Sequence, residues 1–78
     1  MSDDMNNIYQ VENNVPSLLA FCLSAIQQQQ FTHALEAALA ALKLEPNHAE
    51  AHHLASHAYG GLDDGFMAQV MLKRAIAL

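Results

Sequence analysis

The chain is short of fixed positive charge and of cysteine, and each shortage excludes a class of function. Lys and Arg together number 3 against 8 Asp and Glu, which gives a formal net charge of −5 over 78 residues. A surface of this sign repels phosphate, so the composition argues against nucleic-acid binding and against anionic membrane surfaces. The single cysteine, Cys22, excludes an internal disulfide and a zinc site built on paired cysteines.

Long apolar runs, a secretory signal and catalytic motifs are missing as well. No apolar run approaches the roughly 20 residues of a membrane-spanning helix, and residues 1–4 lack a basic region, so a cytoplasmic protein is expected. Gly60-Gly61 is not followed by the Lys and Ser or Thr of a phosphate-binding loop. Cys22 is expected inside an apolar helix, where burial raises its pKa and makes it inert. The sequence therefore predicts that the chain is not an enzyme.

Apolar residues recur at helical spacing in four segments. The expected helices cover residues 15–30, 33–44 and 49–59, with a fourth from residue 65 or 66 to residue 78. Asn14 and either Asp63 or Asp64 are the expected caps, Pro46 ends the second helix, and Gly60-Gly61 is expected to break the third with left-handed backbone angles. The pattern predicts an all-α fold of about four helices after a flexible N-terminal arm, residues 1–14.

The sequence also repeats itself with a period of 34 residues. Four of five positions keep their chemical character when Ala34, Leu35, Ala41, Leu42 and Leu44 are compared with Ala68, Gln69, Ala75, Ile76 and Leu78. A period of about 34 residues is typical of helical hairpins that stack into a solenoid.

On these residues the chain resembles the tetratricopeptide repeat family. The first copy, residues 15–48, has Phe31 at the aromatic position that opens the second helix, the two signature alanines Ala34 and Ala41, and the closing Pro46. The second copy, residues 49–78, has the corresponding small, aromatic and alanine positions at Ser56, Tyr59, Ala68 and Ala75.

The second copy also departs from the family pattern. His52 stands where the family usually has a tryptophan or tyrosine. The chain stops before a second closing proline and before a polar capping helix, so the second repeat is expected to be truncated.

The resemblance implies tandem helix-turn-helix hairpins of an α-solenoid that acts as a protein-interaction scaffold. In the family, the first helix of each hairpin lines a concave groove that receives a peptide or helix of a partner protein. Carried onto this chain, the partner-binding residues are Leu19, Leu23 and Ile26 from the first copy and Glu50, His53 and His57 from the second.

Two other functions stay open. The last helix is expected to turn Phe66, Val70 and Ile76 inward, and without a following repeat these residues would form the interface of a homodimer or larger homo-oligomer. In the second alternative, the chain is the N-terminal regulatory region of a larger bacterial enzyme such as a transferase, because similar repeats precede catalytic domains in some bacterial proteins.

The histidines are the remaining candidate ligands. His48 and His52, and separately His53 and His57, lie four residues apart, a helical spacing that can chelate zinc, copper or nickel. Two imidazoles make an incomplete site and no cysteine joins them, so no metal and no other cofactor is expected.

Overall fold

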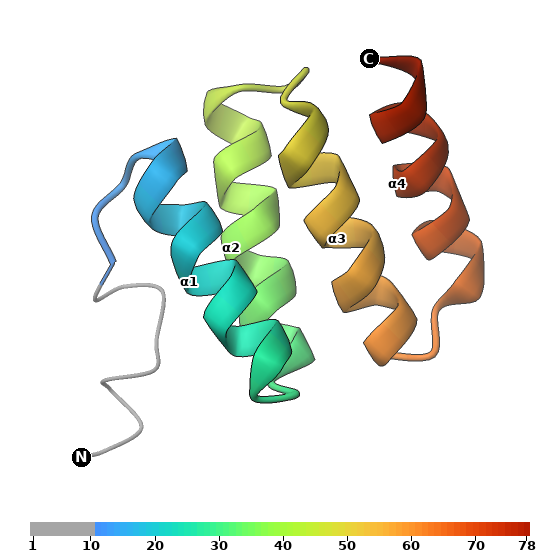
Figure 1. The fold of residues 1–78 in the computed structure, drawn as a ribbon, viewed down its shortest axis with the longest axis horizontal. Helices are drawn as coiled ribbons and strands as arrows, with labels where there is room; N and C mark the ends of the chain where they lie inside the picture. The colour runs from blue at the N-terminus through green and yellow to red at the C-terminus, as the bar shows by residue number, and fades with distance from the viewer. Residues whose placement is uncertain (1–10) are drawn as a thin grey trace.

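The computed structural model describes residues 11–78, and these residues form four α-helices and no strand. The helices are α1 (Val15–Gln27), α2 (Phe31–Leu44), α3 (Ala49–Gly61) and α4 (Gly65–Ala77). Short turns join them at alternate ends, so that α1–α2 and α3–α4 form two helical hairpins side by side (Figure 1). The all-α prediction is confirmed. None of the four described helices combines the length and the apolar character that crossing a membrane requires.

The two hairpins have the same backbone layout at a spacing of 34 residues. Their first helices begin at Val15 and Ala49, and their second helices begin at Phe31 and Gly65. Each hairpin turn contains one residue with a positive φ, 59° at Gln29 and 63° at Asp63. The two turn residues are also 34 positions apart, so the repeat in the sequence corresponds to a repeat of structure in the described residues.

Small side chains let the first three helices approach closely. The buried residues of α2 are all alanines, each with 0 % of its surface exposed: Ala34, Ala37, Ala38 and Ala41. Larger residues of α1 and small ones of α3 complete the core, chiefly Leu18, Leu19, Cys22, Ala51, Ala55 and Ala58. The burial of these closely packed apolar side chains is the main source of stability in so short a chain.

The last helix, α4, is the least buried. Met71 is its one buried residue, while Phe66 and Ile76 are each 77 % exposed. The prediction that Phe66 and Ile76 face inward is therefore wrong. The physical reason is that α4 packs mainly against α3, and no helix in the described part of the chain covers its other side.

Polar side chains cap the ends of the helices. Asn14 Oδ1 accepts a hydrogen bond from the Ser17 backbone N–H at 2.9 Å, as predicted for α1, and Asp64 Oδ1 accepts one from the Met67 N–H at 3.1 Å. Most of the predicted N-terminal arm, residues 1–10, lies outside the described residues. Of the arm's last four residues, Val11 packs partly against the core and Asn14 belongs to the cap.

The two adjacent glycines differ from the prediction. Helix α3 continues through Gly61, none of the three glycines has a positive φ, and the left-handed residue of this turn is Asp63. A Cβ atom built on Gly61 would overlap the ring of Phe31, whereas one on Gly60 would meet nothing within 4 Å. Gly61 is therefore required by the close approach of α3 to the start of α2, not by its backbone angles.

Candidate functional site

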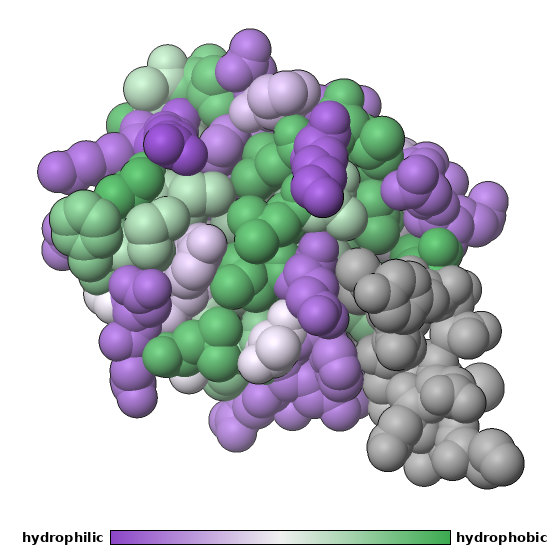
Figure 2. All heavy atoms as spheres, turned by 180° about the vertical axis from the view of Figure 1, so that it is seen from behind, coloured by the Kyte–Doolittle hydropathy of each residue, from purple (hydrophilic) through white to green (hydrophobic). Residues whose placement is uncertain are grey.

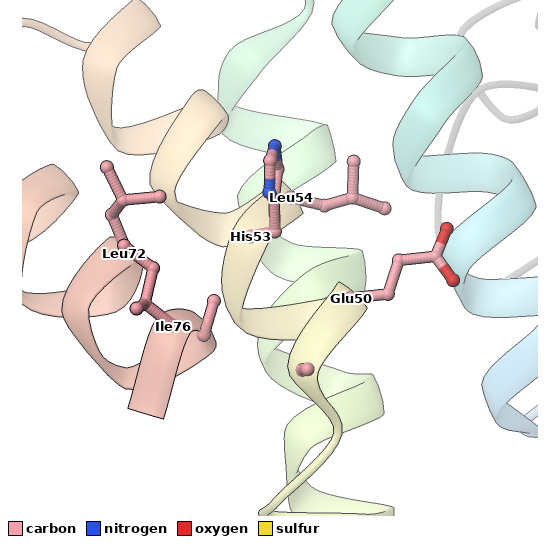
Figure 3. Close-up of a pocket in the computed structure, with 7 residues that line it drawn as sticks. Glu50, His53, Leu54, Leu72 and Ile76 are labelled. Atoms are coloured by element: carbon pink, nitrogen blue, oxygen red, sulfur yellow. The ribbon is translucent and has the colours of Figure 1, made fainter. Parts of the chain in front are cut away.

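A groove with a volume of about 470 Å³ lies between α3 and α4 and is called the α3–α4 groove below. Figure 3 shows Leu72 and Ile76 of α4 across from His53 of α3, while the Glu50 carboxylate extends away from α4. Its lining is apolar except for Glu50 and His53, and consists of Ala49, Glu50, His53, Leu54, Leu72, Ala75 and Ile76. Apolar grooves with a few polar groups are the usual form of a binding site.

Exposed apolar residues are not confined to this groove. From the opposite side, hydrophobic side chains gather across the middle of the molecule, bordered by hydrophilic ones (Figure 2). Leu39 and Leu44 of α2 are 37 % and 45 % exposed, close to the 40 % of Leu72. Exposure alone therefore does not distinguish the α3–α4 groove from the rest of the surface.

Most of the corresponding surface of the first hairpin is covered, and this distinguishes the groove: of the seven equivalent positions four are buried, Leu42 is half-buried, and Pro16 and Ala20 are exposed. The residues 34 positions before Ala49, His53, Leu72 and Ala75 are 0 % to 8 % exposed: Val15, Leu19, Ala38 and Ala41. Helix α3 packs against both α1 and α2. The α3–α4 groove is thus the second hairpin's equivalent of the surface on which α3 itself lies.

The structure separates the six residues predicted to contact a partner. Leu19 is 8 % exposed and belongs to the core, so it offers little surface, while Leu23 is 46 % exposed and Ile26 is half-buried. Glu50 and His53 both line the α3–α4 groove, and His57 is exposed one turn farther along α3. The three residues from the second copy are therefore brought together on α3.

The residues predicted for an oligomer interface are also divided. Ile76 lines the α3–α4 groove, Phe66 is exposed at the start of α4 without lining the groove, and Val70 packs partly against the core. Sequence reasoning missed Leu72, the second large side chain that α4 contributes to the groove. A signal was present, because Leu72 replaces the Ala38 of the first copy with a much larger residue.

His53 and His57 converge on the exposed side of α3. Their Nε2 atoms are 3.0 Å apart, and their rings stack with centroids 4.8 Å apart and planes at 30°. The Ser56 hydroxyl donates a hydrogen bond to the His53 carbonyl at 2.7 Å, so it is directed at the backbone and away from the pair. Two imidazole nitrogens therefore face each other at the surface.

The other histidine pair holds the turn between α2 and α3. His52 is 6 % exposed, and its Nε2 lies 2.7 Å from the Pro46 carbonyl oxygen. A carbonyl only accepts hydrogen bonds, so the proton resides on Nε2. His48 Nδ1 accepts a hydrogen bond from the Ala51 N–H at 3.2 Å, which caps α3. One nitrogen of each ring is therefore occupied by a structural contact, so the two rings do not pair with each other as His53 and His57 do.

The lone thiol behaves as expected. Cys22 has 0 % of its surface exposed, and burial raises its pKa from 9.0 to about 11. A thiol of this kind stays protonated and is a poor nucleophile. Among residues 11–78, no three side chains of His, Cys, Asp or Glu gather closely enough to surround a metal ion.

No family model matches the chain, and no curated protein or solved structure matches it either.

Proposed function

We propose that the chain is a protein-interaction domain of the tetratricopeptide type that binds a helix of a partner protein in the α3–α4 groove. One observation carries this proposal: the equivalent surface of the first hairpin already has a helix packed on it, namely α3. A surface of the same layout, left open by the second hairpin, fits an occupant of the same kind.

The side chains of α3 indicate which helix fits such a surface. Residues of α3 that are buried while their equivalents in α1 are exposed or half-buried depend on contact with the neighbouring hairpin. These residues are Ala51, Leu54, Ala55 and Ala58, against Ser17, Ala20, Phe21 and Ser24 in α1. The expected partner helix therefore carries one leucine among small residues on its docking face, which lets the two backbones approach closely.

Charge adds a second requirement. Glu50 is exposed at the edge of the α3–α4 groove, and the chain has a formal net charge of −5. Charge complementarity steers association and fixes the orientation of a bound helix. The partner helix is therefore expected to place a Lys or Arg opposite Glu50.

The proposal is tested with a displayed library of helices. Every member carries one leucine and three small residues at the spacing of Ala51, Leu54, Ala55 and Ala58, and a Lys on the flank of that face. Selected helices are then titrated against purified variants. Leu72→Glu introduces a charge into the apolar groove and is expected to weaken binding at least about tenfold. Leu39→Glu is the matched control, since Leu39 is exposed to 37 %, Leu72 to 40 %, and Leu39 does not line the groove.

The control is expected to leave the affinity unchanged. Equal losses in the two variants, or equal enrichment of a library in which the same residues are scrambled, would contradict the proposal. The first outcome would show nonspecific apolar binding, and the second would show that the groove does not read the spacing of small residues.

Self-association is a second candidate function, favoured by the exposure of α4. Phe66 and Ile76 are each 77 % exposed and Leu78 is 55 % exposed, so a second copy has apolar surface to cover. The net charge of −5 opposes the approach of two copies. Sedimentation over a wide concentration range separates the two candidate functions. If the chain binds a partner, we expect it to be a monomer. If it self-associates, we expect a dimer that Ile76→Glu dissociates and Leu39→Glu does not.

A further inference from the structure

The facing imidazoles of His53 and His57 have the separation of two ligands on one metal ion. With metal–nitrogen bonds of about 2.1 Å, two ligands at a right angle lie about 3.0 Å apart, whereas two at the tetrahedral angle lie about 3.4 Å apart. The observed distance between the Nε2 atoms is 3.0 Å. The pair thus matches adjacent corners of a square-planar or octahedral site.

The pair is also free to change its bonding. Both residues are exposed, and their two Nε2 atoms contact each other. In the neutral pair one ring donates a hydrogen bond from Nε2 to the other. When a metal ion binds, the proton of the donating ring moves to its Nδ1, so that both rings stay neutral and both Nε2 atoms offer a lone pair to the ion. Helix α3 fixes the spacing of the two residues, so little conformational freedom is lost on binding.

We infer that His53 and His57 together chelate one divalent transition-metal ion of the kind that prefers square-planar or octahedral nitrogen sites, Cu²⁺ or Ni²⁺. Imidazole nitrogen suits both ions, and both favour right angles between neighbouring ligands. Water fills the remaining positions of the ion at the surface of α3. The inference does not depend on the proposed helix-binding function, because it rests only on these two side chains.

The second histidine pair supplies an internal control. His48 and His52 have the same spacing in the sequence, but the His52 ring is buried against Pro46 and His48 Nδ1 caps α3. This pair is not expected to bind an ion. His48→Asn keeps a side chain that caps helices well and removes one imidazole, so it is matched to a substitution in the proposed site.

The test is a calorimetric titration of the full chain, without a histidine tag, with Ni²⁺ alone. One ion per chain is expected. His57→Gln, which removes one of the two ligands, is expected to lower the affinity at least about tenfold, whereas His48→Asn is expected to leave it unchanged. A second readout is the thermal midpoint, which Ni²⁺ is expected to raise in the unmodified chain and EDTA to restore.

Three results would overturn the inference. His57→Gln binding Ni²⁺ as tightly as the unmodified chain would exclude chelation by the pair. An equal loss in His48→Asn would show that any surface imidazole contributes. Half an ion per chain would mean that the ion bridges two copies and is not chelated within one.

Discussion

His52 shows how one polar side chain can belong to an apolar core. It occupies the position of Leu18 in the first hairpin, and both are buried, at 6 % and 2 % exposed. Its Nε2 ties α3 to the Pro46 carbonyl across the α2–α3 turn, while its Nδ1 is buried without a hydrogen-bond partner. The hydrogen bond from Nε2 and the packing of the ring together outweigh the cost of burying the unpaired Nδ1.

Removal of that ring is therefore expected to destabilise the fold. His52→Ala should lower the free energy of unfolding by about 2 kcal/mol, because it loses both a buried hydrogen bond and core volume. His53→Ala, at the adjacent exposed position, should change it by less than about 0.5 kcal/mol. Urea denaturation in the presence of EDTA measures both, and similar losses would contradict a structural role specific to His52.

The buried thiol of Cys22 should make the stability of the fold depend on pH in the alkaline range. Burial raises the pKa of the Cys22 thiol from 9.0 to about 11, so the unfolded chain loses this proton at a lower pH than the folded chain does. Stability from this group is complete below pH 9 and falls as pH rises from 9.0 to about 11, by about 2 to 3 kcal/mol in all.

The control for this effect is Cys22→Ala, which removes the thiol and keeps a small apolar residue. Across this pH range the unfolding free energy of the unmodified chain should fall relative to that of Cys22→Ala, as measured by denaturation at fixed pH values. A difference that stays constant with pH would show that the thiol does not ionise as expected.

At the scale of the helices, the two glycines that end α3 should respond in opposite directions. Gly60→Ala adds a methyl group in open space within a helix and should raise the free energy of unfolding by up to about 1 kcal/mol. Gly61→Ala places its Cβ in the ring of Phe31 and should lower it by about 1 to 3 kcal/mol. Thermal unfolding of the two variants checks this, and two changes of the same sign would be inconsistent with the packing described.

The missing cap of α2 leads to another prediction. Gln30 precedes α2 with no side-chain hydrogen bond at φ −94° and ψ 70°, while its equivalent Asp64 caps α4 at φ −100° and ψ 75°. Gln30→Asp should therefore form the same cap and stabilise the chain by about 0.5 to 1 kcal/mol.

Gln30→Asn separates the cap from the added charge, because it offers the same acceptor without a negative group. A gain in the aspartate variant alone, measured by denaturation, would indicate an effect of charge and not of capping.

Helix number and order followed from apolar periodicity, but helix ends did not. Residue 30 was the predicted end of the first helix because four successive glutamines are compatible with a helix, yet α1 ends at Gln27 and Gln29 adopts a φ of 59°. No residue type at this position signals a left-handed turn. Asp63 escaped prediction for a different reason: Gly60 and Gly61 precede it by three and two residues, and glycine is the more usual left-handed residue.

For the whole molecule, the candidate site was predictable only in part. The resemblance to a known repeat placed Glu50 and His53 among the partner-binding residues, and both line the α3–α4 groove, whereas Ile76, which also lines it, was expected to face inward. Which apolar residues stay open depends on which surfaces another helix covers, and sequence periodicity does not contain that information. Leu19 and Leu72 show the limit: Leu19 is 8 % exposed within the core, and Leu72 is 40 % exposed where no described helix follows.

The burial of one residue in α4 also determines which part of the molecule opens first. A helix held mainly by α3, with Met71 as its one buried residue, can detach while α1, α2 and α3 stay packed. Backbone amides of α4 should therefore exchange with deuterium at least about tenfold faster than those of α2. Equal protection of the two helices, measured by NMR, would mean that the four helices open together.

Because α4 opens locally, its rate of deuterium exchange depends on whether the α3–α4 groove is occupied. Any molecule that occupies the α3–α4 groove must hold α4 against α3, and so must slow deuterium exchange in α4 more than in α1 or α2. Occupancy of the groove becomes measurable as a selective change in exchange, before the identity of the occupant is known.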